Sequence, residues 1–191
     1  MSKNKHKHKH RQPPPKPVDP FVGATPTVCL SVIVKNESAV IERMLSTVAP
    51  ILDYYVVVDT GSTDGTQDIV RDFFAKRGIP GEVIQHEWIS YADARNTALK
   101  HTIGKADFGF WIDADEQLIL HEGFAPSLFK RSLGGFDGAN VNVSYGGQEY
   151  FRMQIFSTKK PWRWYGPLHE VLVCDRSEEH TSELQSRSAI S

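Results

Sequence analysis

The chain has 191 residues, of which 40% are hydrophobic and 24% are charged, and its net charge at pH 7 is −1. This length and composition are typical of one soluble globular domain with enough apolar side chains for a core. They exclude a membrane-spanning helix, because no segment reaches about 18 uninterrupted apolar residues. The two cysteines, Cys29 and Cys174, exclude a disulfide framework and a cysteine-rich metal site, so we expect a reducing, cytoplasmic setting.

The first 26 residues differ from the rest of the chain and are expected to form a disordered arm. Residues 1–16 carry six basic side chains and no acidic one, and prolines are frequent from position 13 to position 20. Repelling charges and proline do not build a core, and no apolar stretch follows that would make a secretory signal. Residues 17–191 hold sixteen basic and twenty-three acidic side chains, and this acidic balance argues against nucleic-acid binding.

Residues 28–80 predict two rounds of strand and helix. The apolar runs Val28–Val34 and Tyr54–Asp59 are typical of buried parallel strands. Between them, apolar residues from Val40 to Val48 recur at helical spacing. A second helix should end at Gly78 and begin after one of three capping residues, Ser62, Thr63 or Asp64.

Residues 83–112 continue the alternation, with strands at 83–86 and 108–112 on either side of a helix at 91–103. Strands that alternate with helices over short connections predict a parallel, doubly wound sheet. Beyond Gly134, apolar residues recur with a period of two, which predicts further strands. We therefore predict an α/β fold, a doubly wound and mainly parallel sheet with a mixed-sheet extension in the C-terminal third.

Two of the predicted strands end in acidic residues. The run Val56–Thr66 passes from an apolar strand into Asp59 and a polar turn, and the run Phe110–Glu116 ends in three acidic residues. In an open α/β sheet, ligands bind at the carboxyl ends of strands, so both acidic ends can face one ligand. Each run by itself is also ordinary turn chemistry, since Asp and Ser cap helices and Gly accepts positive φ.

The spacing of Asp113 and Asp115 suits a divalent cation. On a strand, residues two apart share a face and lie about 6.8 Å apart, so both carboxylates can reach one Mg²⁺ or Mn²⁺ directly or through water. Together with Glu116 they place three acidic groups within four residues, which repel one another unless a cation is present. The alternative is an acidic loop that only closes the strand.

Over roughly residues 28–173, the order and spacing of these motifs resemble family 2 glycosyltransferases, which have a nucleotide-sugar-binding GT-A fold. The resemblance implies a set of nucleotide-binding residues at the first two strand ends: Lys35, Asn36, Glu37, Asp59, Gly61, Ser62 and Asp64. Asp59 is implied to contact the base or ribose. Many relatives have a second acid at the next position, where this chain has Thr60, and this difference leaves the base contact open.

The resemblance also implies a place for the donor diphosphate. Asp113 and Asp115 would hold Mg²⁺ or Mn²⁺ on it, with Asp113 also among the nucleotide ligands. Arg95 would lie near the donor phosphates, which a guanidinium binds with two parallel hydrogen bonds. A salt bridge at the protein surface is the alternative for Arg95.

Two late motifs, Arg152–Phe156 and Gly166–Glu170, extend the resemblance. They imply that His169 completes the metal or diphosphate shell and that Glu170 is the general base, so that Glu170 and the metal ligand Asp115 are the catalytic candidates. A purely structural histidine is the alternative for His169.

The favoured function is an inverting glycosyltransferase that moves a sugar from a nucleotide-sugar donor, UDP-linked by resemblance, to a saccharide, lipid-linked or protein acceptor. Peripheral membrane contact is compatible with these acceptors. Haloacid-dehalogenase phosphatases also carry Asp-x-Asp, but they require Thr or Val where this chain has Gln117. A nucleotidyltransferase requires a glycine-rich basic loop after the first strand. This chain has Val-Lys-Asn-Glu-Ser there, at residues 34–38, which is not such a loop. A non-catalytic nucleotide-sugar-binding module stays open as the alternative.

The end of the chain departs from the domain pattern. Permitted codons for residues 176–186 spell a common short-read sequencing adapter, so we expect residues 176–191 to be non-native. The domain at 27–175 would then be incomplete at its C-terminus. A polar C-terminal tail is the alternative.

Overall fold

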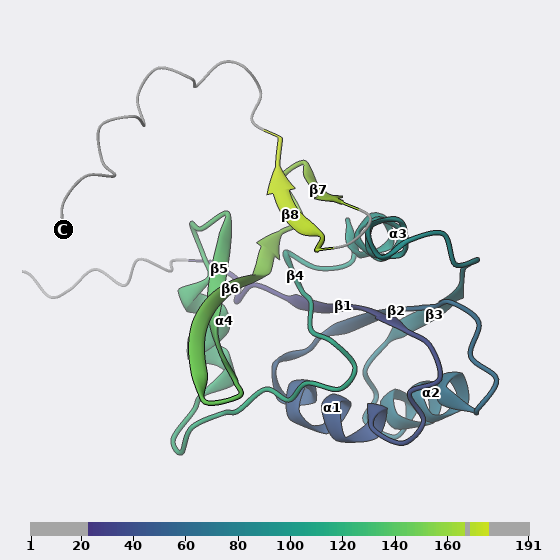
Figure 1. The fold of residues 1–191 in the computed structure, drawn as a ribbon. Helices are drawn as coiled ribbons and strands as arrows, with labels where there is room; N and C mark the ends of the chain where they lie inside the picture. Colours follow the sequence, from purple (N-terminus) through teal and green to yellow (C-terminus); the bar gives the residue numbers. More distant parts are fainter. Residues whose placement is uncertain (1–22, 167–168, 176–191) are drawn as a thin grey trace, which may run out of the picture.

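The computed structural model describes residues 23–166 and 169–175, and its ribbon is shown in Figure 1. Residues 1–22 of the predicted arm and the whole predicted tail, 176–191, lie outside the described residues. The elements follow in chain order: β1 Val28–Val34, α1 Ile41–Val48, the 3₁₀ turn η1 Ala49–Ile51, β2 Tyr54–Asp59, α2 Thr66–Ala75, β3 Gly81–Gln85, α3 Tyr91–Thr102, β4 Phe108–Phe110, α4 Pro126–Ser132, β5 Gly138–Tyr145, β6 Gln148–Ser157, β7 Trp162–Tyr165 and β8 Val171–Cys174.

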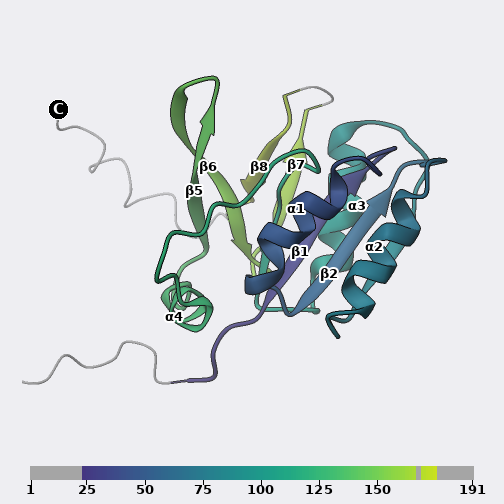
Figure 2. The ribbon, with the colours of Figure 1, turned by 90° about the horizontal axis from the view of Figure 1, so that it is seen from below.

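The main sheet has six strands in the order β3-β2-β1-β4-β6-β5. The first four are parallel, whereas β6 runs antiparallel to both β4 and β5. Helices α1 and α2 cover one face of the parallel part and α3 covers the other (Figures 1 and 2). The predicted α/β fold with a mixed-sheet extension is therefore confirmed, and the carboxyl ends of β1, β2 and β4 meet at one edge.

The core lies mainly between the sheet and helices α1 and α2. The predicted helical spacing is confirmed in α1, whose buried residues are Ile41, Met44, Leu45 and Val48. The rings of Phe74 and Tyr55 stack across this layer with centroids 4.0 Å apart. Burying one such large side chain stabilises the fold by roughly 1.5–3 kcal/mol, so the layer holds the strand ends in place.

Several boundaries differ from the sequence-based prediction. The N-cap of α2 is Gly65, at φ +88°, and not one of the three polar candidates before it. Strand β4 ends at Phe110, and the backbone N–H of Glu116 donates to the carbonyl of Asp113 at 3.1 Å. The predicted strand at 108–112 is therefore two residues too long, and the two aspartates lie on a turn beyond its end. Helix α4 and the separate β7–β8 sheet were not predicted.

Helix α4 escaped prediction because it is short and none of its residues is fully buried. An ion pair holds it in place, since the Nζ atom of Lys130 lies 2.7 and 2.8 Å from the two carboxylate oxygens of Asp53. Within residues 23–166 and 169–175, no helix combines the length and the apolar character needed to cross a membrane.

Candidate functional site

A cavity of about 680 Å³ opens at the carboxyl edge of the parallel strands. Loops after β1 and β4, the start of α3 and the segment before β8 contribute to its walls. Seven of the residues predicted for the site line it: Lys35, Glu37, Arg95, Asp113, Asp115, His169 and Glu170. Trp88 and Tyr91 also line it, with their rings edge to face at 4.8 Å. The tertiary structure thus gathers predicted site residues as distant in the sequence as Lys35 and Glu170, which are 135 residues apart.

The carboxylate of Asp59 is fully buried at the end of β2. Its Oδ1 atom accepts hydrogen bonds from the backbone N–H groups of Gly61 and Ser62, at 2.9 and 2.8 Å, and from the Gln67 side chain at 3.1 Å. Its Oδ2 atom is also buried and has no hydrogen-bond partner in the described part of the chain. Because buried polar atoms are nearly always paired, this oxygen is a candidate acceptor for a hydrogen bond donated by a ligand.

Most polar groups of the turn after β1 and the turn after β2 hold these two turns together. Asn36, at φ +56°, accepts from the N–H of Thr63 through its side-chain oxygen at 2.8 Å, and its own N–H donates to the Ser62 hydroxyl at 2.8 Å. The N–H of Ser38 donates to Oδ2 of Asp64 at 2.9 Å. Of the predicted nucleotide-binding residues, a group of five does not line the cavity: Asn36, Asp59, Gly61, Ser62 and Asp64.

Asp113 is held by two arginines. Its Oδ1 atom lies 2.6 Å from Nη2 of Arg95, and its Oδ2 atom lies 3.6 Å from Nη1 of Arg152. The carboxylate of Glu116 accepts hydrogen bonds from Arg152 at 2.5 and 2.8 Å and from the N–H of Asp113 at 3.1 Å. The two arginines therefore compensate the charge of Asp113 and fix the orientation of its carboxylate.

Asp115 is exposed, and its carboxylate makes no hydrogen bond or ion pair with residues 23–166 or 169–175. The pKa of the Glu37 carboxyl is raised above its ordinary value. Burial is the main cause, and the negative charges of Asp115 and Asp64 add to it. An uncompensated carboxylate in a cavity suits a hard divalent cation, which takes carboxylate, water and phosphate oxygens. The residues present therefore fit the metal that the resemblance implies, with Asp115 as the available ligand.

His169 and Glu170 come next to each other before β8, and they differ in their surroundings. His169 is exposed, lines the cavity and has a φ of +54°. Within the described residues, it does not assemble with the acidic groups into a cluster of three or more metal-binding side chains. Glu170 is largely buried and accepts a hydrogen bond from Nε of Arg95 at 2.8 Å.

The sequence analysis assigned no role to three residues that the structure places in this network: Glu116, Arg152 and Asn96. Glu116 and Arg152 stand inside runs that were singled out, and Asn96 follows the predicted Arg95, so adjacency to the predicted ligands was the available signal. Their contacts run between elements that are distant in sequence, for example 36 residues from Glu116 to Arg152. The Glu116–Arg152 pairing depends on the antiparallel placement of β6 beside β4, and that of Asn96 on the placement of β7 beside α3, so neither can be read from local spacing.

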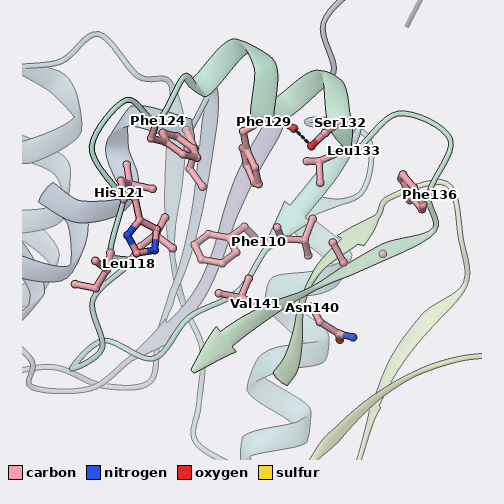
Figure 3. Close-up of a pocket in the computed structure, with 16 residues that line it drawn as sticks. Phe110, Leu118, His121, Phe124, Phe129, Ser132, Leu133, Phe136, Asn140 and Val141 are labelled. Carbon is pink, nitrogen blue, oxygen red and sulfur yellow. Dashed lines mark hydrogen bonds between the residues drawn. The ribbon is translucent and has the colours of Figure 1, made fainter. Parts of the chain in front are cut away.

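A second cavity, of about 520 Å³, lies between α4, β5 and the segment after the acidic turn (Figure 3). Apolar side chains dominate its lining, among them Phe110, Phe124, Phe129 and Val141. It adjoins the main core, and of the acidic groups at the carboxyl edge none lines it. The charged cavity is therefore the candidate functional site.

Residues 29–183 match the family described as Glycosyl transferase family 2. An uncharacterized glycosyltransferase of Rickettsia bellii is 38% identical over 94 residues, which cover 49% of this chain and 29% of that protein. A TPR repeat-containing protein of Synechococcus elongatus is 29% identical over 157 residues, which cover 80% of this chain and 37% of that protein. The chain thus spans well under half of the length of these two relatives.

One solved structure with a similar arrangement is the mannosyltransferase of Pyrobaculum calidifontis in complex with GDP-Man and Mn²⁺. It is 26% identical, with a TM-score of 0.49, and the match covers 62% of this chain and 35% of that protein.

Proposed function

Because this chain belongs to glycosyl transferase family 2, we propose that it transfers a sugar from a nucleotide-sugar donor to a hydroxyl group of an acceptor, with inversion at the sugar carbon. The observation that carries this proposal is the cavity at the carboxyl edge, where a lysine, an uncompensated aspartate and a partly buried glutamate face one space. Its volume, about 680 Å³, is in the range of small-molecule sites.

The strand order supports a direction for the donor across this edge. Asp59, with its unpaired buried oxygen, ends β2 and would receive a donor N–H or O–H group from the base or ribose. Lys35 follows the neighbouring β1 and would contact the phosphates. Asp115 follows β4, which pairs with β1 on the side opposite β2. The donor would therefore run from its base at β2 to its diphosphate at β4.

Mg²⁺ or Mn²⁺ is the proposed cofactor, with Asp115 as its available ligand and Asp113 and His169 as further candidates. A bound cation supplies charge neutralisation at the diphosphate, an effect of several kcal/mol. Such interactions accelerate transfer only so far as they are stronger in the transition state than in the ground state.

Glu170 is the proposed general base. Its carboxylate would accept the proton of the acceptor hydroxyl while the acceptor oxygen forms a bond to the sugar carbon and the bond from that carbon to the diphosphate oxygen breaks. One in-line displacement of this kind inverts the sugar carbon, and a positioned base contributes roughly 10²–10⁴-fold to the rate. The hydrogen bond from Nε of Arg95, at 2.8 Å, holds the Glu170 carboxylate in one orientation.

We further propose uridine as the base, a saccharide, lipid-linked or protein acceptor, a cytoplasmic location with peripheral membrane contact, and residues 27–175 as the transferase domain. Donor turnover separates this proposal from a binding module. The purified chain, given UDP-sugars with Mn²⁺, should release nucleoside diphosphate, and chelation should stop the release. Metal-dependent binding of UDP without any turnover would favour the binding module instead.

A further inference from the structure

The small β7–β8 sheet carries Glu170 into the site, yet β7 and β8 form a two-stranded sheet of their own, separate from the six-stranded sheet. Its position relative to the cavity therefore depends on side-chain contacts. Apart from β8, α3 is the element against which β7 packs (Figure 1). What fixes this packing also fixes the proposed general base.

Asn96 of α3 pairs with the backbone of β7 as a neighbouring strand would. Its Nδ2 atom donates to the carbonyl of Trp164 at 3.0 Å, and its Oδ1 atom accepts from the N–H of the same residue at 2.9 Å. A side-chain amide presents one donor group and one acceptor, which match one backbone residue. This pair holds β7 at a single register along α3.

Arg95, the preceding residue, makes the second connection. Its guanidinium joins Glu170, through Nε at 2.8 Å, to Asp113, through Nη2 at 2.6 Å. It also lies near the rings of Trp111 and Trp164, with centroid distances of 4.6 and 4.9 Å. Only 7% of its side chain is exposed. Two aromatic rings and two carboxylates thus hold one buried guanidinium.

We propose that Arg95 and Asn96 are positioning residues that set the Glu170 carboxylate relative to Asp113, and that Arg95 is not a ligand of the donor phosphates. The proposal rests on the proposed function of Glu170 and Asp113. The Nε and Nη2 donors of Arg95 already serve the two carboxylates, and moving them onto a phosphate would leave two negative groups without their buried partner. Breaking such a pair is costly.

The chemistry makes this alignment important. A displacement of about 1 Å in a reacting group can lower the rate by roughly 10²-fold. Lysine offers a single charge and no planar fork, so it cannot hold two carboxylates in the same geometry. Arg95→Lys therefore tests alignment while it keeps the positive charge.

The experiment compares Arg95→Lys and Asn96→Ala with a matched control, Arg163→Lys. Arg163 lies on the same hairpin but is 47% exposed, and it pairs with Asp175 at the surface. For each folded variant, calorimetry measures the affinity for UDP with Mn²⁺, steady-state kinetics measures donor turnover, and NMR hydrogen exchange measures the Trp164 amide without nucleotide.

Positioning predicts that Arg95→Lys keeps the UDP affinity within about twofold while kcat falls by roughly 10²-fold. Asn96→Ala should speed exchange of the Trp164 amide at least tenfold, because its acceptor is gone. The control should change none of these quantities. A tenfold loss of UDP affinity in Arg95→Lys would overturn the proposal and show that Arg95 is a phosphate ligand. Unchanged exchange of the Trp164 amide in Asn96→Ala would overturn the positioning role of Asn96.

If Arg95→Lys does not fold, the Asn96→Ala exchange and kinetics decide the question. Failure of the proposed function has a different signature: the unsubstituted protein would then bind no nucleoside diphosphate. In that case the exchange measurement, which needs no nucleotide, still shows whether Asn96 holds β7.

Discussion

Nη2 of Arg95 and Oδ1 of Asp113 lie 2.6 Å apart at the base of the charged cavity. With Arg152 on its other oxygen, Asp113 already has its charge compensated, whereas the Asp115 carboxylate has no such partner among residues 23–166 and 169–175. The two aspartates of the Asp-x-Asp motif are therefore unequal, although the sequence presents them as equivalent.

This inequality predicts different effects of two substitutions. Asp115→Ala should abolish Mn²⁺-dependent UDP binding and leave the melting temperature within about 1–2 °C, because surface changes usually cost little. Asp113→Asn should lower the melting temperature by several degrees, since it weakens the pairs that compensate Arg95 and Arg152. Calorimetry and thermal denaturation measure the two effects. Equal loss of metal-dependent binding with no difference in stability would contradict the distinction.

Asp59→Asn should weaken UDP binding even without metal. The change removes a charge and replaces one acceptor of a fully buried side chain with a donor. We expect a loss of roughly 10- to 100-fold, as for other hydrogen bonds to charged groups worth about 1.5–3 kcal/mol. A thermal-shift comparison of UDP, GDP and CDP checks the choice of base, and stronger stabilisation by GDP or CDP would show that uridine is wrong.

Burial raises the pKa of the Cys29 thiol to about 12, whereas its ordinary value is 9.0. Between these values the unfolded chain loses the proton and the folded protein retains it, so the folded state loses stability as the pH rises from about 9 toward 12. Three pH units correspond to roughly 4 kcal/mol. In Cys29→Ala this part of the alkaline destabilisation should disappear, as denaturant unfolding at pH 8 and pH 10.5 would measure. An identical slope in both proteins would show that Cys29 is not responsible.

Asp64 should give the opposite dependence. Hydrogen bonds, first from the Thr66 hydroxyl, hold the pKa of its carboxyl well below the ordinary value of 3.8. Its stabilisation is therefore present above that value and is lost as the pH falls toward the folded-state pKa. Asp64→Asn should lower the melting temperature at pH 7, and the difference should narrow at pH 2–3. The neighbouring exposed Asp68, replaced in the same way, is the control.

Deleting residues 1–22 and 176–191 should change the melting temperature by no more than about 1–2 °C, for the compositional reasons that set them apart from the domain. Thermal unfolding of the shortened chain tests this division of the sequence. A larger loss of stability would mean that one of these segments contributes to the folded domain.

The strands and helices of the first half were predictable because their signals are local. The bounds of β1 and β2 agree with the apolar runs, and buried parallel strands are the elements that such runs specify most directly. Helix α4 and the β7–β8 sheet were not predictable in this way, because α4 has no fully buried residue and β7 depends on Asn96, 68 residues before Trp164. The α2 cap was mispredicted because Gly65 occupies the cap position while Asp64 accepts from the backbone beside it.

The sequence by itself determined the alternation of strands and helices, and with it the edge at which the acidic residues gather, because parallel strands end on the same side of a sheet. It also determined which chemical groups stand there. Only the tertiary structure decided how those groups pair. Arg95 joins Asp113 to Glu170, and within the described residues Asp115 has no charged partner and one oxygen of Asp59 has no hydrogen-bond partner. The physical reason is that burial and charge pairing depend on which side chains meet across distant segments, and local spacing does not specify those meetings.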